Sequence, residues 1–167
     1  LVNAVAVAAA GDVPAIILDF GTATTFDVVR PAAPDSDVSA IYAGGVIAPG
    51  VHRSVEALVA AAAKLPSLAV ENFEPNLPVL GTSTESAMKS GVLWGNVGLI
   101  DGLLNRIKAE QGMAEAVVIG TGGLASLFAP QSEAIDQVDH ALTMTGLRII
   151  CNRNKGYVSD GHEKRVR

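Results

Sequence analysis

The segment AIILDFGTATTFDVV, residues 15–29, decides the fold of this chain of 167 residues. Its first part, Ala15 to Phe20, is a short run of apolar and mostly branched residues, which is typical of a buried strand. Thr24 to Val29 continues in residues that favour β structure, after a small turn at Gly21 to Ala23. The simplest structure for this pair of segments is a β-hairpin.

The residues after the hairpin predict one more antiparallel strand and then a change to helices. Ser39 to Ala43 is expected to return as the third strand and to end at the glycine pair that follows. Apolar residues at three- and four-residue spacing predict a helix from Val51 to about Leu65. A long second helix is expected from Thr84 to about Gly112, where Thr84 and Ala87 form only a partial capping signal.

The last third of the chain alternates between apolar runs and helical patterns. We expect a strand at Ala116 to Gly120, a turn at Thr121 to Gly123, a short helix at Leu124 to Phe128, a short strand at Ala134 to Val138 and a helix from about His140 to Asn152. Three antiparallel strands followed by alternating helices and strands are typical of an α/β fold with a ribonuclease-H-like mixed sheet, which has helices on its faces.

The long second helix carries four glycines at nearly regular spacing, namely Gly91, Gly95, Gly98 and Gly102. Each glycine inside a helix costs about 1 kcal/mol relative to alanine. Such a pattern predicts a face against which another backbone packs closely, from either a second helix or a second subunit.

Composition restricts the classes of function. Hydrophobic residues make up 49% of the chain and charged residues 17%, as in one globular domain. A net charge of -5 gives no overall attraction to nucleic acid. The longest apolar runs, such as Ala57 to Ala63, are far below the ~20 residues that cross a bilayer. A single cysteine, Cys151, excludes an intrachain disulfide and fits a reducing compartment, which predicts a cytoplasmic protein.

The two ends of the sequence differ in character. The first residues, 1–11, have the pattern of a helix entered partway, so we expect the chain to be a piece of a longer protein. Residues 148–167 carry six of the twelve basic residues. We therefore expect one domain over residues 1–154, followed by a solvated and partly disordered basic tail over residues 155–167.

The strongest local candidate for chemistry is the turn of the predicted hairpin, residues 19–25. It places a carboxylate, Asp19, at the end of a buried strand, followed by glycine and hydroxyl residues. Backbone N–H groups and threonine hydroxyls in such a turn can bind a phosphate while the carboxylate engages a cation. The alternative is that Asp19 only caps the turn by accepting hydrogen bonds from backbone amides.

Two other glycine-rich segments are weaker candidates. Residues 42–50 (YAGGVIAPG) let the backbone approach a ligand or another strand, but they do not match a P-loop or a dinucleotide-binding fingerprint. Residues 120–123 lie between a predicted strand and a predicted helix, where amides can face a phosphate or an adenosine, or form an ordinary turn. His52, His140 and His162 lack metal-ligand spacing.

Taken together, five ordered motifs resemble those of the type III pantothenate kinases, which belong to the superfamily of acetate and sugar kinases, heat-shock ATPases and actin. These motifs are DFGTATTFDVV (19–29), YAGGVIAPG (42–50), AAAKLP (61–66), GTSTESAMKSG (81–91) and IGTGGLA (119–125). The similarity reaches from the first residue to about Asn154. It implies that residues 1–154 form the C-terminal lobe of an actin-like ATPase fold.

The resemblance also implies an activity, which is the ATP-dependent phosphorylation of pantothenate to 4′-phosphopantothenate, the first step of coenzyme A biosynthesis. By that resemblance Asp19 would hold a monovalent cation (K⁺ or NH₄⁺), Gly21 and Thr22 would contact ATP phosphate, Gly122 and Gly123 would line the adenosine side, and Thr84 would bind pantothenate. Mg²⁺ on the phosphates would complete the set. Phosphoryl transfer depends mainly on such positioning and charge neutralisation.

The family's catalytic base and a pantothenate contact lie in a Gly-x-Asp-Arg segment, which is expected upstream of Leu1 together with the first lobe. We therefore expect this chain alone to have no kinase activity. The family is homodimeric, and the glycine-bearing helix is the expected subunit contact. The alternatives are a non-catalytic regulator on the same fold, or another sugar-kinase-like or actin-like ATPase. Intact Asp19 and Thr22 favour an enzyme, and the segment around Thr84 favours pantothenate.

Overall fold

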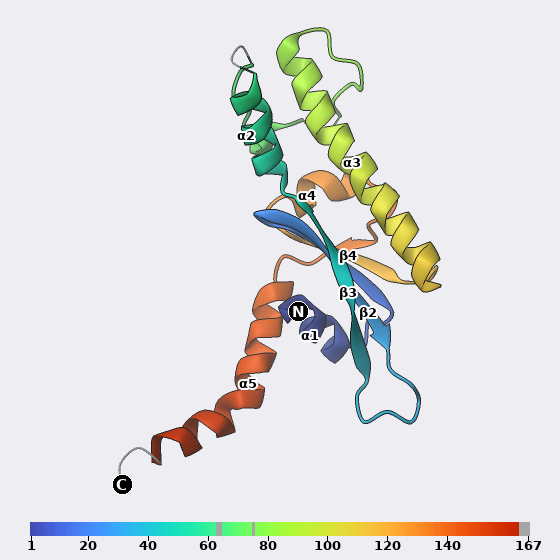
Figure 1. Cartoon of the computed structure of the whole chain (residues 1–167), viewed down its shortest axis with the longest axis vertical. Coiled ribbons are helices and arrows are strands. Elements are labelled where there is room, and N and C mark those ends of the chain that lie inside the picture. The colour runs from blue at the N-terminus through green and yellow to red at the C-terminus, as the bar shows by residue number, and fades with distance from the viewer. Residues whose placement is uncertain (63–64, 75, 164–167) are drawn as a thin grey trace.

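The computed structural model describes residues 1–62, 65–74 and 76–163, and a mixed β-sheet lies at its centre (Figure 1). The strands are β1 (Ala15–Phe20), β2 (Ala23–Pro31), β3 (Ala40–Pro49), β4 (Val117–Gly122) and β5 (Gln137–Val138). They lie in the order β3-β2-β1-β4-β5. β1 pairs with β2 in antiparallel and with β4 in parallel orientation, so the predicted ribonuclease-H-like mixed sheet is confirmed.

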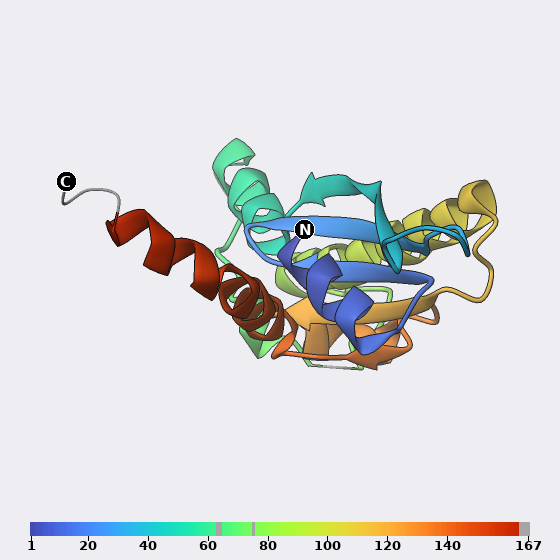
Figure 2. The same cartoon turned by 90° about the horizontal axis from the view of Figure 1, so that it is seen from below.

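Helices cover both faces of this sheet (Figure 2). They are α1 (Val2–Ala10), α2 (Val51–Ala61), α3 (Thr84–Gln111), α4 (Ala125–Phe128) and α5 (Leu142–Glu163), with short 3-10 turns at Val70–Asn72 and Ala129–Gln131. Side chains alternate between the faces along each strand. Leu18 and Phe26 pack in the core with α2, α3 and α4, while Ile17 and Val29 pack in a second core with α1.

The predicted hairpin is confirmed, and β1 has the predicted bounds, Ala15–Phe20. The last paired residues are Phe20 and Thr24, which leaves the turn at residues 21–23. The Gly21 amide donates to the Ala23 carbonyl at 3.1 Å and closes this turn. The turn therefore stands at the carboxyl end of β1, beside the carboxyl end of the parallel strand β4.

The predicted end of the third strand at the glycine pair is wrong, because β3 continues through Gly44 and Gly45 to Pro49. A Cβ on Gly45 would lie 2.1 Å from the Phe26 carbonyl oxygen, so this glycine lets β3 approach β2. A β-bulge between Val28 and Val29 accommodates the irregular register. Gly45 therefore allows close strand packing, although the sequence pattern predicted the end of the strand here.

Three other boundaries also differ from expectation. Thr121 and Gly122, which were expected in a turn, extend β4, because they pair with Asp19 and Phe20 of β1. β5 is shorter than the predicted strand from Ala134. The last helix continues through Glu163, past the predicted end at residue 152, although its later residues lack apolar periodicity. Two sets of residues lie outside the described part of the chain. They are residues 164–167 of the predicted tail and residues 63–64 near the end of the helix predicted from Val51.

α3 begins one residue after its N-cap, Ser83, rather than at a cap formed by Thr84. The Ser83 hydroxyl accepts from the Ser86 amide at 3.2 Å, and the Ser83 amide donates to the Ser86 hydroxyl at 2.9 Å. Serine thus fills the position that glutamate usually takes in a capping box. A Cβ on any of the four α3 glycines would meet open space, so within the described part of the chain no backbone packs closely against them.

The first and last helices pack against each other on the face of the sheet opposite α3 (Figure 2). A Cβ on Gly146 of α5 would lie 2.2 Å from the Val2 carbonyl oxygen of α1. The two helix backbones are therefore in direct contact at this glycine. Leu142 at the start of α5 is 5% exposed and belongs to the same core as Val7.

Candidate functional site

The turn between β1 and β2 is held in place by two glycines from other segments. A Cβ on Gly50, which caps α2, would lie 2.2 Å from the Thr22 carbonyl oxygen. A Cβ on Gly122, at the end of β4, would lie 2.5 Å from the Phe20 carbonyl oxygen, and its φ of +90° also favours glycine. The backbone of the turn is thus enclosed by neighbouring backbone, while Gly21 and Thr22 are exposed.

A cavity of about 330 Å³ opens beside this turn. Three of the residues predicted to bind ATP, Gly21, Thr22 and Gly123, line it together. The structure therefore brings together segments that are about a hundred residues apart in the sequence. Gly122, the fourth residue in that prediction, does not line the cavity but fixes the local backbone through its close approach to β1.

The cavity lining also carries charged side chains from α2 and from the 3-10 turn Val70–Asn72. Arg53 donates to Glu56 at 2.7 Å, and His52 Nε2 lies 3.4 Å from a Glu71 oxygen. All four residues line the cavity. Exposed pairs of this kind contribute little to stability. Arg53 can therefore exchange the Glu56 carboxylate for another anion at small cost.

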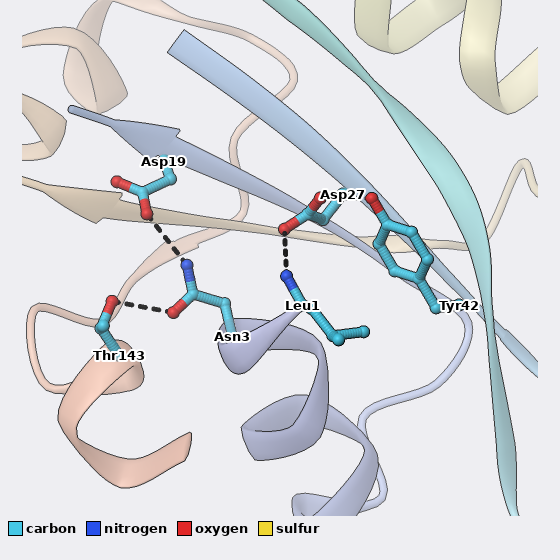
Figure 3. A network of polar contacts seen from close by, with 6 residues as sticks. All are labelled: Leu1, Asn3, Asp19, Asp27, Tyr42 and Thr143. Carbon is cyan, nitrogen blue, oxygen red and sulfur yellow. Dashed lines mark hydrogen bonds and ion pairs between the residues drawn. The ribbon is translucent and has the colours of Figure 1, made fainter. Parts of the chain in front are cut away.

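Asp19 lies on the other face of the sheet, toward α1 and α5, and does not line this cavity (Figure 3). Its Oδ2 accepts a hydrogen bond from Asn3 Nδ2 at 3.0 Å. Asn3 in turn accepts from the Thr143 hydroxyl at 2.8 Å. The geometry therefore does not support the alternative in which Asp19 serves only as a cap for backbone amides, because Asp19 accepts its hydrogen bond from the Asn3 side chain.

Oxygen donors gather around Asp19 through the register of the sheet. Thr25 of β2 and Thr121 of β4 are its directly paired neighbours, so all three side chains leave the sheet on one face. Asp19 Oδ1 lies 3.8 Å from the position of a Cβ on Gly21, on the side of the turn. A carboxylate with neighbouring hydroxyls fits a hard cation such as K⁺, because such ions prefer oxygen ligands.

A second polar group lies farther along the same face (Figure 3). The Tyr42 hydroxyl donates to Asp27 Oδ1 at 2.9 Å, and the amino group of Leu1 lies 3.4 Å from Asp27 Oδ2. The hydrogen bond to Asp27, followed by desolvation and the nearby negative charge, raises the pKa of Tyr42 above its ordinary value of 10.0. The Tyr42 hydroxyl thus stays protonated as a donor.

Thr84, the predicted pantothenate ligand, lies in a third place. It lines a groove of about 780 Å³ between α2 and α3, together with Leu58, Met88 and Gly91. The groove contains neither Asp19 nor the residues of the turn. Within this chain, the predicted substrate residue is therefore separate from the predicted phosphate residues.

The sequence analysis missed two residues near Asp19, the predicted cation ligand. Asn3 contacts Asp19 directly, and Thr143 contacts it through Asn3. Thr143 is 140 positions away from Asn3, and no local pattern marks it. The available sequence signal for Asn3 was a single amide residue in the otherwise apolar segment 2–10. Among the described residues there is no cluster of three or more histidine, cysteine or acidic side chains with metal-binding geometry.

The sequence profile described as "Type III pantothenate kinase" matches residues 1–106. The chain belongs to the type III pantothenate kinase family. It is 47% identical over 154 residues to a type III pantothenate kinase of Caulobacter vibrioides, covering 92% of this chain and 56% of that protein. The corresponding enzyme of Rhodospirillum rubrum is 51% identical over 155 residues, with 93% and 56% covered. The chain spans about half the length of these curated pantothenate kinase relatives.

A solved structure supports the fold of this pantothenate kinase family member. It is described as a conserved putative Baf family transcriptional activator from Campylobacter jejuni. The match has a TM-score of 0.61 at 20% sequence identity and covers 93% of this chain and 65% of that chain. The chain therefore has the fold of one lobe of an actin-like ATPase. None of the helices in the described ranges is long and apolar enough to span a bilayer.

Proposed function

We propose that this chain is the C-terminal lobe of a cytoplasmic enzyme that phosphorylates pantothenate to 4′-phosphopantothenate with ATP, the first step of coenzyme A biosynthesis. The observation that carries the proposal is the cavity shared by Gly21, Thr22 and Gly123 at the carboxyl ends of β1 and β4. Ligands of open α/β sheets bind at such strand ends. Family membership supplies the substrate class.

In this proposal the exposed turn binds the phosphates of ATP. The Thr22 hydroxyl and turn amides donate to phosphate oxygens, and Gly123 on the same cavity leaves room for the nucleoside. Arg53, now paired with Glu56, lies on the same cavity and adds positive charge. Mg²⁺ and a monovalent cation, when bound, neutralise charge on the transferred phosphoryl group. Asp19, with Thr25 and Thr121 beside it, is the residue that would hold the monovalent cation.

Pantothenate would bind at Thr84, in the groove between α2 and α3. The separation of this groove from the phosphate cavity means that further residues must bring substrate and nucleotide together. In a homodimer the second copy can supply such residues, since the open glycine face of α3 leaves room for it. Dimers with twofold symmetry are the commonest protein assemblies.

The test uses the full-length natural protein that contains these residues, in a coupled ADP-release assay with pantothenate. Thr22→Val removes the exposed hydroxyl and is expected to lower kcat/KM about 10²-fold, as for loss of one donor to a reacting group. Thr24→Val is the matched control, because Thr24 is 2% exposed and its hydroxyl has no hydrogen-bond partner among the described residues.

Two results would contradict the proposal. One is a full-length protein with no pantothenate-dependent ADP release, which would favour the regulatory alternative. The other is an equal effect of the Thr22 and Thr24 substitutions. The separate polypeptide of residues 1–167 is expected to turn over below ~0.1 s⁻¹, against about 1 to 100 s⁻¹ for kinases, because it covers about half of the relatives' length.

A further inference from the structure

Asn3 is a buried amide at the junction of α1, β1 and α5 (Figure 3). Asn3 is 6% exposed, in a helix whose other buried residues are apolar. It lies between Asp19 at 3.0 Å and Thr143 at 2.8 Å. A polar side chain is costly to bury unless its hydrogen bonds are made. Both polar ends of this amide are satisfied by residues that are far apart in the sequence.

The chemistry of the three groups allows one direction for these hydrogen bonds. An ionised carboxylate only accepts, so the NH₂ end of Asn3 must face Asp19. The carbonyl end of Asn3 then faces Thr143, whose hydroxyl has to donate. The resulting chain runs from Thr143 through Asn3 to Asp19, and hydrogen bonds in such a chain strengthen one another.

This chain of hydrogen bonds fixes one oxygen of Asp19 and leaves the other available. Oδ2 is held by Asn3, whereas the second oxygen points away from Asn3 (Figure 3). That second oxygen is the one beside the turn, 3.8 Å from a Cβ position on Gly21. Because Asn3 is uncharged, it orients the carboxylate without cancelling its charge. A carboxylate held in this way is preorganised for a cation.

We infer that Asn3 and Thr143 are positioning residues that hold the Asp19 carboxylate in the orientation that binds a monovalent cation. The inference rests on the cation role that the proposed function gives to Asp19. A purely structural role of the two residues would change the stability of the fold equally at every cation concentration. A positioning role instead changes the concentration at which the cation acts.

The experiment measures the melting temperature of the full-length natural protein against K⁺ concentration, at constant ionic strength maintained with choline. Thr143→Val keeps the shape of the side chain and removes the donor. We expect it to raise the half-maximal K⁺ concentration about five-fold, the effect of one lost hydrogen bond. Thr143→Ser keeps the hydroxyl and is expected to stay within about two-fold of the natural protein.

Two further variants complete the set. Asn3→Ala removes the donor to the carboxylate itself and is expected to raise the half-maximal K⁺ concentration about ten-fold, because hydrogen bonds to charged groups are stronger. Thr145→Val is the matched control on the same helix. Thr145 is half-buried, and within the described residues its side chain forms no hydrogen bond with Asn3. It should leave the K⁺ midpoint unchanged.

The outcomes separate this inference from the proposed function. Equal K⁺ midpoints for Thr143→Val and Thr145→Val would overturn the positioning role, while a K⁺ response of the natural protein would leave the cation role of Asp19 intact. Phosphorylation of pantothenate without any K⁺ response in melting would overturn the inference and leave the kinase activity standing. If ADP release is absent but the midpoint shifts as expected, the inference holds and the proposed function fails.

Discussion

The glycines around the β1–β2 turn and the glycines of α3 are the same residue type but have opposite surroundings. A Cβ on Gly50 or Gly122 would meet backbone oxygens at 2.2 and 2.5 Å. A Cβ on Gly91, Gly95, Gly98 or Gly102 would meet nothing within 4 Å. The first group holds the turn through contacts made inside the chain. The second group makes no such contact within the described residues.

The largest expected effect follows from the most constrained glycine of the first group. Gly122→Ala combines a φ of +90° with a contact to the Phe20 carbonyl oxygen, and it should lower the free energy of unfolding by about 3 kcal/mol. Gly123→Ala is the neighbouring control, because its Cβ would meet open space. Urea denaturation of both variants measures the difference. Similar midpoints for the two would show that the close approach at β4 does not constrain the chain.

A smaller effect is expected at the cap of α2. Gly50 has a φ of -67°, which any residue adopts, so Gly50→Ala acts through its close contacts with the backbone of Thr22 and Gly21. We expect a loss of about 2 kcal/mol in the free energy of unfolding. Gly21→Ala is the control, since its nearest contact would be at 3.5 Å. Chemical denaturation that ranks Gly21→Ala as the more damaging variant would contradict this account.

The α3 glycines are expected to behave in the opposite way. Gly95→Ala and Gly98→Ala should each raise the free energy of unfolding of the monomeric chain by about 1 kcal/mol, because alanine is the better helix former. In the full-length protein the same variants should weaken the proposed dimer, which analytical ultracentrifugation measures. A natural full-length protein that sediments as a monomer would remove the subunit interface from this explanation.

The smallest effect concerns the pKa of Tyr42. Asp27→Asn removes the negative charge and replaces the carboxylate acceptor with a weaker, neutral amide carbonyl, so the pKa of Tyr42 should fall toward 10.0. In the natural chain the raised pKa contributes stability that is complete below pH 10.0 and is lost as the pH rises through the folded value. Tyrosinate absorbance reports the titration in a background where Tyr157, the second tyrosine, is replaced by phenylalanine.

Asp37→Asn is the control for that titration, since Asp37 is exposed and is not a partner of Tyr42. The hydroxyl of Tyr42 should keep its raised pKa in this variant. A fall of the same size in both variants would mean that general surface charge, rather than the contact with Asp27, sets the pKa of Tyr42.

The sequence was sufficient where local patterns determine structure. The apolar run of β1 and the turn after it were predicted at the correct residues, because a buried strand and a small-residue turn are local features. Gly45 was misinterpreted as a strand end, since its close packing on Phe26 depends on the register of a neighbouring strand. The cap of α3 was placed at Thr84 instead of Ser83, because serine in place of glutamate weakens the capping-box pattern.

The candidate site was predictable in parts. The turn at Thr22 and the segment at Gly123 were both identified, and the structure places them on one cavity. Their separation from Asp19 could not be read from the sequence, because Thr22 and Gly123 lie beyond the strand ends, where the alternation of side chains along a strand no longer sets their direction. Thr143 was missed for a different reason, since its contact with Asn3 joins two helices across nearly the whole chain.

The contact between Gly146 and Val2 has a practical consequence for following the molecule in solution. Because the backbones of α5 and α1 touch there, a displacement of one helix must carry the other. Cys151 is the single cysteine of the sequence, and it is exposed on α5. A spin label or fluorophore on this native thiol would report movement of the helix that carries Asn3, with no engineered attachment point.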